Sequence, residues 1–431
     1  MLYCASYLHT EKVNRIFQGI YAAFMKKFHG LFICLLLITQ QIRAQLIASI
    51  LVKAGSFRRN NSIVYTTLPA AAGNTPLSME EIRDGKRIPV AVNVYKGQLS
   101  WIMEGITPAG TARKYELKKG IPVTQPLMKT VLQNGHLLLE EQQQPILQYN
   151  FQTVPAPAGA DTVYSRSAFI HPLWAPNGIV LTNVFPNAGH LHHMGIWNPW
   201  THTLFEGRET DFWNVQKKEG KVRFNGDLET LSGNVWCGFS AGQDHIAFLK
   251  DGTEKTAIRE TWLVQAYPAT NEGSRRQWDF TTTFAPATAN GITLLQYRYG
   301  GGFGLRTTPE FTAQTSQVLT SEGKDRNGAD STRARWVKIS GTTAKGKAGM
   351  LIMNYPDNFD SPEPLRVWPE DMEGGELMFN YTPTRMKAWQ LYPGARYQLK
   401  YRVMVFCGDI TAAEAEAAWE EYVHPPEVQI I

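Results

Sequence analysis

The chain has 431 residues, 43% of them hydrophobic, which is enough apolar material for one large core or two domains. Its formal net charge is +5, but residues 1–44 contribute five basic side chains against one acidic side chain. Residues 45–431 carry 38 basic and 37 acidic side chains, a balance that argues against a nucleic-acid partner, which requires a basic surface.

The first 44 residues have the pattern of a secretory signal peptide. Residues 25–27 (Met-Lys-Lys) give a basic start, residues 31–38 form an apolar run, and Ala44 is the small residue at its end. We expect translation to begin at Met25, with residues 1–24 as an over-extended start, and cleavage after Ala44. The apolar run is shorter than the about 20 residues of a membrane span. The mature protein is therefore expected in the periplasm or outside the cell, without a membrane span.

Two cysteines, Cys237 and Cys407, follow the predicted cleavage site. No Cys-x-x-Cys spacing occurs, which excludes a zinc ribbon or a thioredoxin-like redox motif. The flanking residues favour two buried, unpaired thiols in strands, although the sequence leaves a disulfide between them open.

The segment 46–120 is predicted to form a small β-sandwich. Residues 47–52 and 61–68 are β-rich runs, and residues 90–102 have the pattern of a hairpin with a turn at residues 96–98 (Lys-Gly-Gln). The short stretch 77–81 is the one part that looks helical.

The segment 121–431 is predicted to form a large β-super-sandwich that carries the candidate site. Short β-rich runs recur through it with Gly and Pro between them and almost no helical periodicity. The expected strands are 137–140, 146–151, 222–225, 234–239, 256–266, 277–286, 292–299, 335–339, 348–354 and 396–406. The number of expected strands is larger than one small sandwich can hold, so we expect a large two-sheet, all-β architecture.

One helix is predicted near the C-terminus. Thr411 and Glu414 have the spacing of a capping box, and residues 412–422 are strong helix formers. We expect this helix to pack against a sheet. Residues 321–335 are polar and glycine-bearing, so they should form an exposed loop, and residues 355–375, with four prolines, a longer structured loop.

The stretch 185–214 is the candidate site, because proton-transfer groups, possible metal ligands and aromatic rings are densest there. If it were a strand, His190 and His192 would face the same side and His193 the other. Such a pair with a carboxylate could bind zinc, iron or manganese, or the histidines could act as acid and base on a sugar. Alternatively, Gly189 and Gly195 place the histidines in a loop, where they bond to backbone. No cofactor is required by the sequence, and a divalent metal is possible.

Asp211 and Glu206 are the candidate carboxylates of this site, and a turn or strand-edge role is the alternative for Asp211. Trp197, Trp200 and Trp213 could provide partly exposed platforms for sugar rings. The alternative for these tryptophans is core packing, since aromatic residues dominate the cores of sandwiches.

Residues 300–306 form a glycine-dense motif, Gly-Gly-Gly-Phe-Gly-Leu-Arg. It lacks the Lys-Ser/Thr of a phosphate-binding loop, so phosphate binding there is not expected. Arg306 could instead clamp a carboxylate or hydroxyl of a substrate, or be an ordinary surface arginine. A Gly-x-Ser-x-Gly motif is absent, so the sequence does not support a serine nucleophile.

Several of these motifs together resemble the PmoA-like family of secreted bacterial proteins. The matching residues are 170–178 (IHPLWAPNG), 184–186, His190, 192–197 (HHMGIW), 211–213 (DFW) and 299–306. The resemblance implies a super-sandwich similar to galactose mutarotase and adds His171 to the candidate substrate-binding residues. Met194 stands where that family commonly has arginine. The family name derives from a membrane-embedded methane mono-oxygenase subunit, an activity that a chain without spanning segments does not have.

The leading hypothesis is a secreted enzyme that processes a sugar or sugar derivative. His190, His192 and His193, with Asp211 or Glu206, would supply the acid–base or metal-assisted chemistry, as a hydrolase, lyase or epimerase. Trp197, Trp200, Trp213, Arg306 and His171 would bind the substrate. The alternative hypotheses are a non-catalytic glycan-binding protein and a structural protein of the cell envelope. The oligomeric state is not given by the sequence.

Overall fold

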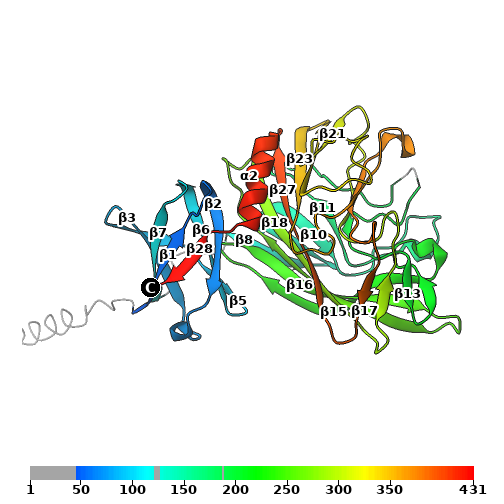
Figure 1. Cartoon of the computed structure of the whole chain (residues 1–431), viewed down its shortest axis with the longest axis horizontal. Helices are drawn as coiled ribbons and strands as arrows, with labels where there is room; N and C mark the ends of the chain where they lie inside the picture. The colour runs from blue at the N-terminus through cyan, green and yellow to red at the C-terminus, as the bar shows by residue number, and fades with distance from the viewer. Residues whose placement is uncertain (1–44, 121–126, 187–188) are drawn as a thin grey trace, which may run out of the picture. The chain divides into compact units, whose positions relative to one another are not determined.

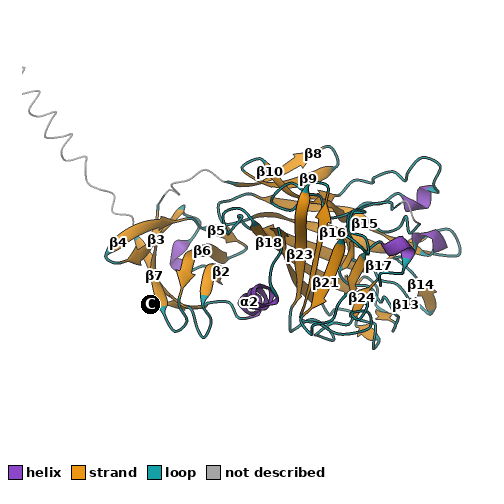
Figure 2. Ribbon diagram, turned by 90° about the horizontal axis from the view of Figure 1, so that it is seen from above, coloured by secondary structure: helices purple, strands orange, loops and turns teal. Residues whose placement is uncertain are grey.

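The computed structural model describes residues 45–120, 127–186 and 189–431. The predicted signal peptide, with Met25 and the cleavage site after Ala44, therefore lies outside the described residues, as do residues 121–126 beside the predicted domain boundary. In the described ranges strands are by far the commonest element (Figure 2), and none of the helices there has the length and apolarity to cross a membrane. The division into domains at residue 120 stays a prediction.

Two small antiparallel sheets enclose a first core, which includes Val64, Trp101 and Tyr115. One has the strand order β28-β1-β7-β3-β4 and the other β2-β6-β5. Their strands are β1 (Leu46–Lys53), β2 (Arg59–Thr67), β3 (Leu77–Arg83), β4 (Lys86–Val90), β5 (Asn93–Tyr95), β6 (Gln98–Thr107), β7 (Ala112–Lys119) and β28 (Glu427–Ile430). Ile430 pairs with Ile50, so the last strand of the chain completes a sheet built from its first strands (red beside blue in Figure 1).

The predicted hairpin is confirmed, and the predicted helical stretch at 77–81 is wrong. Lys96 and Gly97 both have positive φ and join β5 to β6, as a two-residue hairpin turn requires. Residues 77–81 belong to β3 instead. Leu77 and Met79 alternate with less buried neighbours and face the core, and β3 pairs with β4 and β7 on its two sides. Pairing on both edges outweighs the helical preference of a five-residue run.

Three further antiparallel sheets follow. The two large ones have the orders β15-β16-β17-β18-β27-β23-β22-β21 and β24-β25-β20-β12-β11-β10-β9-β8, and the smaller one β14-β13-β19-β26. Their strands are β8 (Met128–Gln133), β9 (His136–Glu141), β10 (Gln144–Asn150), β11 (Phe169–Leu173), β12 (Ile196–Trp197), β13 (Thr203–Phe205), β14 (Arg208–Thr210), β15 (Gly220–Leu231), β16 (Cys237–Phe248), β17 (Glu254–Ala266), β18 (Arg275–Pro286), β19 (Ile292–Leu294), β20 (Gly304–Arg306), β21 (Ser316–Thr320), β22 (Trp336–Thr343), β23 (Gly346–Asn354), β24 (Leu365–Val367), β25 (Met378–Tyr381), β26 (Trp389–Leu391) and β27 (Tyr397–Cys407).

The two large sheets share one core, which confirms the predicted all-β fold with a large super-sandwich. Tyr149 on β10 stacks on Phe239 of β16 with ring centroids 4.6 Å apart and lies 5.8 Å from Trp262 of β17, so rings from the two sheets meet between them. Two predicted strands have other bounds than expected: the strand predicted at 234–239 begins only at Cys237 and runs to Phe248 as β16, and the strand predicted at 292–299 ends at Leu294 as β19.

Two other sequence-based expectations have mixed outcomes. Neither Cys237 nor Cys407 forms a disulfide, and both lie in strands, but only Cys237 is fully buried. Residues 321–335 form a loop, as expected, yet Arg326 within it is only 1% exposed. Its guanidinium donates to the carbonyl oxygens of Trp368 and Gly375 at 3.0 and 2.8 Å, which anchors the loop in the protein.

The predicted C-terminal helix is confirmed as α2 (Ala412–Val423). The Thr411 hydroxyl accepts from the Glu414 N–H at 3.1 Å, and the Glu414 carboxylate accepts from the Thr411 N–H at 2.7 Å. Ala415 and Trp419 pack against residues of the sheet, among them Phe406. The helix covers β22, β23 and β27 of that sheet, as predicted.

Replacing Thr411 with alanine should lower the free energy of unfolding by about 1 kcal/mol, because it removes the side-chain acceptor that caps the first turn of α2. Urea unfolding of the purified protein would measure this loss. Thr411→Ser keeps the hydroxyl and should keep most of the stability. Equal losses in both variants would show that the cap contributes nothing.

Candidate functional site

The three neighbouring histidines lie in a turn, so of the two interpretations of this stretch the strand does not apply. The His193 N–H donates to the His190 carbonyl oxygen at 2.8 Å, which closes the turn. His190 has φ of +54°, a left-handed conformation that a strand cannot contain. The loop between Gly189 and Gly195, which was the alternative, is what the structure shows.

Because of this turn, all three imidazoles converge instead of facing two sides. One ring nitrogen from each of His190, His192 and His193 lies within 4.8 Å of the others. The rings of His190 and His193 are stacked with centroids 5.0 Å apart, and His192 meets His193 edge-on at 4.6 Å. Trp197 packs against the cluster, since its ring stacks on the His193 ring with the two centroids 5.0 Å apart.

Two of these imidazoles are held in the neutral form. Burial, with the nearby positive charges of Arg166 and Arg306 acting in the same direction, lowers the pKa of His192 to about 3. Burial also places the pKa of His193 well below its ordinary value. Neutral imidazoles keep a lone pair free for a metal ion. In His193, which is 2% exposed, the buried Nδ1 atom has no hydrogen-bond partner.

A carboxylate contacts the most exposed of the three rings. Glu373, in a short 3₁₀ turn (Glu373–Gly375), lies 3.2 Å from Nε2 of His190. A metal-binding histidine commonly donates its other ring N–H to a carboxylate, which fixes the ring orientation. Glu373 is placed to do this for His190.

The histidines border a small cavity of about 80 Å³. Its wall is formed by His190, His192, His193, Trp213, Asn214, Arg298, Tyr299, Arg366, Trp368, Met372 and Met378. A water molecule occupies about 30 Å³ of the liquid. The cavity thus has room for an ion and one small polar group, or for one end of a larger molecule.

Strand pairing explains why segments so distant in sequence meet at this cavity. Ile196 of β12 pairs with Leu305 of β20, and Leu305 pairs with Phe379 of β25. The histidine turn precedes β12, Arg298 and Tyr299 precede β20, and the segment from Trp368 to Met378 leads into β25. The three segments therefore meet beside neighbouring strands of one sheet.

Asp211 supports the wall without lining it. Its carboxylate accepts from the N–H groups of Trp213 and Asn214 at 2.8 Å, from the Asn214 side chain at 2.7 Å and from the Thr201 hydroxyl at 2.9 Å, and pairs with Lys217. Burial alone would raise the pKa of Asp211, but the bonds from Asn214 and the Lys217 ammonium hold it below its ordinary value. This is the turn role that was the alternative for Asp211.

Glu206 is not brought to the histidines. It lies in the turn between β13 and β14 with φ of +48°, and both carboxylate oxygens accept from the Lys255 ammonium at 2.7 Å. In the described ranges no interaction joins it to the cavity wall. The sequence placed it close to the histidines, but a hairpin carries it away from them.

The expectation that the three tryptophans are partly exposed is wrong. Trp197, Trp200 and Trp213 are each at most 1% exposed. Trp200 packs against Phe284 and Trp389, so core packing, the alternative, describes it. Only Trp213 of the three lines the cavity.

Arg306 and His171 also lie outside the cavity wall. Arg306 is 1% exposed, pairs with Glu376 and places its guanidinium 4.7 Å from the ring centroid of Trp368, so neither a substrate clamp nor a surface position describes it. It is buried because Glu376 and Trp368 enclose it. His171 bonds through Nδ1 to the Thr182 hydroxyl at 2.9 Å, and burial lowers its pKa to about 4.

The family of the chain can be stated from its sequence match. Residues 136–420, about two thirds of the chain, match DUF6807, which is described as a family of unknown function. The chain belongs to the DUF6807 family. The match covers the histidine turn and every residue of the cavity wall. It carries no PmoA-like name, so that resemblance stays a prediction.

Solved structures resemble the DUF6807 chain only distantly. An α-mannosidase from Enterococcus faecalis V583 has a TM-score of 0.44 at 9% identity, over 96% of this chain and 50% of its own. A glycosyl hydrolase family 38 protein from Enterococcus faecalis has a TM-score of 0.43 at 10% identity, over 90% and 47%. The chain thus spans about half the length of these two proteins.

A galactose mutarotase related enzyme from Lactobacillus acidophilus has a TM-score of 0.20 at 9% identity, over 66% of this chain and 99% of its own. No curated protein matches the sequence. The similar structures are named as carbohydrate-active enzymes, but likeness of this degree carries no inference about the activity of the DUF6807 chain.

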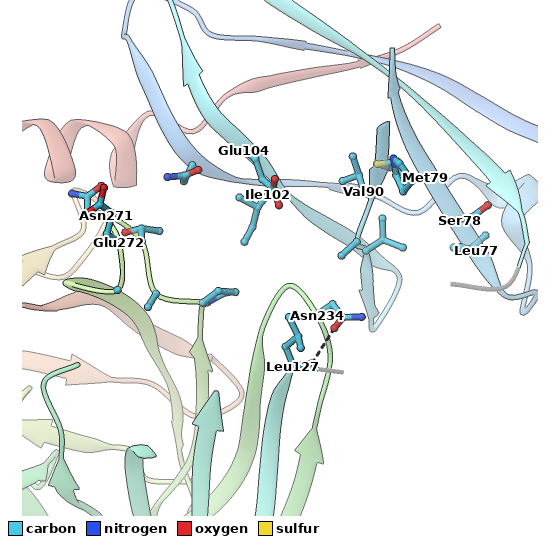
Figure 3. A pocket seen from close by; sticks show the side chains of 18 residues that line it. Leu77, Ser78, Met79, Val90, Ile102, Glu104, Leu127, Asn234, Asn271 and Glu272 are labelled. Atoms are coloured by element: carbon cyan, nitrogen blue, oxygen red, sulfur yellow. Dashed lines mark hydrogen bonds between the residues drawn. The ribbon is translucent and has the colours of Figure 1, made fainter. Parts of the chain in front are cut away.

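A larger cavity of about 590 Å³ lies elsewhere, between β3, β4 and β6 and the turn that joins β17 to β18 (Figure 3). Its wall is largely apolar, as Val90 and Ile102 illustrate, and Glu104 and Glu272 are the charged side chains among its described lining residues. Histidine and arginine do not line it in the described part of the chain. Since metal-ligating groups do not converge there, the smaller cavity is the better candidate site.

Seven of the eleven residues of the described cavity wall were not among the predicted site residues: Asn214, Arg298, Tyr299, Arg366, Trp368, Met372 and Met378. Tyr299 opens the segment 299–306 that carried the family resemblance, and Arg298 stands directly before it, so their position was a usable signal. Arg366, Trp368 and Met372 lie in the proline-bearing loop 355–375, which carries no recognisable motif. Only the strand pairing described above reveals that this loop meets the histidines.

Proposed function

We propose that this DUF6807 protein is a secreted, metal-dependent enzyme that acts on a sugar or sugar derivative at the cavity of His190, His192 and His193. The observation that carries the proposal is the convergence of three ring nitrogens within 4.8 Å, with an unpartnered nitrogen on the buried His193. Three histidines with an open fourth position are a common arrangement for a catalytic zinc ion.

The residues of the wall have distinct parts in this proposal. The three imidazoles would hold the ion, and Glu373 would orient His190. A metal ion in such a site activates water or polarises a carbonyl group of the substrate. Burial raises the pKa of Tyr299, so its hydroxyl stays protonated and can donate a hydrogen bond to a substrate oxygen.

An aromatic side chain at the cavity supports a sugar as the substrate. Trp213 and Trp368 border the cavity but are at most 3% exposed, whereas Tyr299 is partly exposed, and the C–H face of a sugar that lies outside the cavity could pack on its ring. The predicted signal peptide and the resemblance to the PmoA-like family favour the same substrate class in the periplasm or outside the cell. N-terminal sequencing of the mature protein would test the export, with Gln45 expected as the first residue.

The proposal differs from the sequence-based hypothesis in its carboxylate. Asp211 and Glu206 do not line the cavity, and their oxygens are occupied by donors of the protein. Acid–base chemistry by a histidine and either carboxylate is therefore replaced by chemistry at a metal ion.

Metal analysis tests the proposal most directly. Purified protein incubated with zinc, iron or manganese and then desalted should retain about one ion per chain. His192→Ala should weaken the affinity at least a hundredfold, because it removes one of three ligands. His202→Ala is the matched control, since His202 lies in the same stretch but contacts Glu209 and Tyr297 outside the cavity.

Turnover on a panel of sugars and oxidised sugars should then require both the metal and His192. Wild-type protein that retains none of the three metals would overturn the proposal. Sugar affinity that survives both metal removal and His192→Ala would point instead to a glycan-binding protein.

A further inference from the structure

We infer that the group received by the histidine cavity is an anionic oxygen group, a carboxylate or a phosphate on a sugar derivative, held between the histidines and the two arginines of the wall. This inference rests on the proposed function and names its substrate class. It is carried by the charges around the cavity, by the hydrogen-bonding capacity of its wall and by its size.

The wall itself contains cations and no carboxylate among its described residues. Arg298 and Arg366 are the two permanently charged side chains that line it. Among the carboxylates that contact wall residues, Glu373 lies 3.2 Å from His190, and Asp211 accepts from the Asn214 side chain at 2.7 Å and pairs with Lys217. Glu376 is likewise occupied, since it pairs with Arg306.

Carboxylates of the described residues balance the positive charges of the two arginines only in part. Arg366 shares the single carboxylate of Asp330 with Arg385, at 3.0 and 3.1 Å. Arg298 is exposed and has no ion pair in the described part of the chain, and its guanidinium lies 5.4 Å from the ring centroid of Tyr299. Arg366 and Arg385 thus share one carboxylate, and Arg298 has no ion pair within the ranges that the structure describes.

Arg166 adds a further positive charge near His192. Arg166 is 3% exposed, its Nε and Nη1 atoms have no hydrogen-bond partner, and its charge acts on His192. Burying an arginine without a counter-ion is costly. A negatively charged ligand in the histidine cavity, held by Arg298 and Arg366, would offset the free-energy cost of burying Arg166.

The hydrogen-bonding groups of the wall also discriminate between ligands. Arginine only donates, and Arg298 and Arg366 therefore need acceptors. The hydroxyl groups of a neutral sugar donate as well as accept, but the Tyr299 oxygen already accepts from the Asn214 side chain at 3.4 Å, while its O–H can donate to an acceptor on the ligand. A carboxylate or phosphate oxygen accepts only, and arginine binds both groups in a bidentate geometry.

The volume of about 80 Å³ fits one such group and a metal ion, while the rest of the substrate would lie outside. A whole sugar ring does not fit, because pockets that enclose drug-sized molecules measure about 300–1,000 Å³. The anionic end of the substrate is therefore the part that the cavity selects.

The experiment measures binding of glucuronate, glucose 6-phosphate and glucose by calorimetry at low salt, to zinc-loaded and to metal-free protein. In the wild type, at least one of the two anions should bind at least tenfold more tightly than glucose. Glucuronate and glucose 6-phosphate separate a carboxylate from a phosphate as the recognised group. Arg298→Gln should weaken that binding at least tenfold, while Arg259→Gln, an exposed arginine on β17, should leave it unchanged.

The result that overturns the inference is glucose binding as tightly as both anions, or anion binding that is equal in the wild type and Arg298→Gln. The proposed function fails separately, if the wild type takes up no zinc. Zinc uptake should be the same in Arg298→Gln and the wild type, since Arg298 is not a ligand. In metal-free protein, the ratio of anion to glucose affinity still decides the inference.

Discussion

Replacing Glu260 with alanine should lower the free energy of unfolding by about 3–5 kcal/mol. Glu260 on β17 is 2% exposed, and its carboxylate is the acceptor for four side chains. It accepts from His245 at 2.7 Å, Asn198 at 2.6 Å, Trp262 at 2.7 Å and Thr282 at 2.5 Å. These partners lie on or beside β12, β16, β17 and β18, so one carboxylate ties several strands of both large sheets together.

The alanine variant leaves four buried donors without an acceptor, and each such group costs about 1–3 kcal/mol before the structure relaxes. Urea unfolding would measure the loss. Glu254→Ala on the same strand is the control, because the Glu254–Arg223 pair is exposed and should contribute less than 1 kcal/mol. Comparable losses in the two variants would show that the buried network contributes little.

Replacing Glu363 with glutamine should stabilise the protein increasingly as the pH rises from about 5 to 8. Glu363 is fully buried in the loop 355–375, and its two oxygens lie 3.0 and 2.9 Å from the Tyr401 hydroxyl. Burial raises its pKa from 4.5 to about 8, and the charge of Asp360 adds to this, while the bond from Tyr401 opposes it.

The folded protein therefore keeps the Glu363 proton over a pH range in which the unfolded chain has released it. Stability from this group is fully present below pH 4.5 and is lost as the pH rises toward 8, by about 1.4 kcal/mol per pH unit. Glutamine cannot ionise, so Glu363→Gln should not show this loss. At pH 8 its free energy of unfolding should therefore exceed that of the wild type by several kcal/mol.

Urea unfolding of both proteins at pH 5, 6, 7 and 8 measures the difference. Tyr401→Phe is the control, since it removes the hydroxyl but keeps the burial, and its pH dependence should remain at least as steep as in the wild type. Parallel stability curves for the wild type and Glu363→Gln would show that Glu363 does not keep its proton in the folded state.

Most of the fold could be predicted because short local sequence patterns identify most of the strands of this chain. The run 256–266 alternates buried and less buried residues over much of its length and appears as β17, and the β-rich run 396–406 appears as β27, whose residues 401–406 are all buried. The capping box at Thr411 likewise needs only four residues to be recognised. The stretch 77–81 failed because its residues favour a helix in isolation, and only the strands on its two sides decide otherwise.

The candidate site likewise has one part that the sequence predicts and one part that it does not. The histidines could be found because they are neighbours in sequence, but their convergence depends on the positive φ of His190, which the sequence does not display. Arg366 and Trp368 reach the cavity through the pairing of β12, β20 and β25, whose members are more than 70 residues apart at each step. Long-range pairing of this kind has no local signature.

The pairing of β28 with β1 has a consequence for how the polypeptide matures. β1 starts at Leu46 and β28 ends at Ile430, so the sheet that contains them stays incomplete until β28 has been synthesised. Until then the edge of β1 offers unpaired amide groups. Such a delay would favour the export that we propose, because the sheet that contains β1 cannot be completed before β28 has been synthesised.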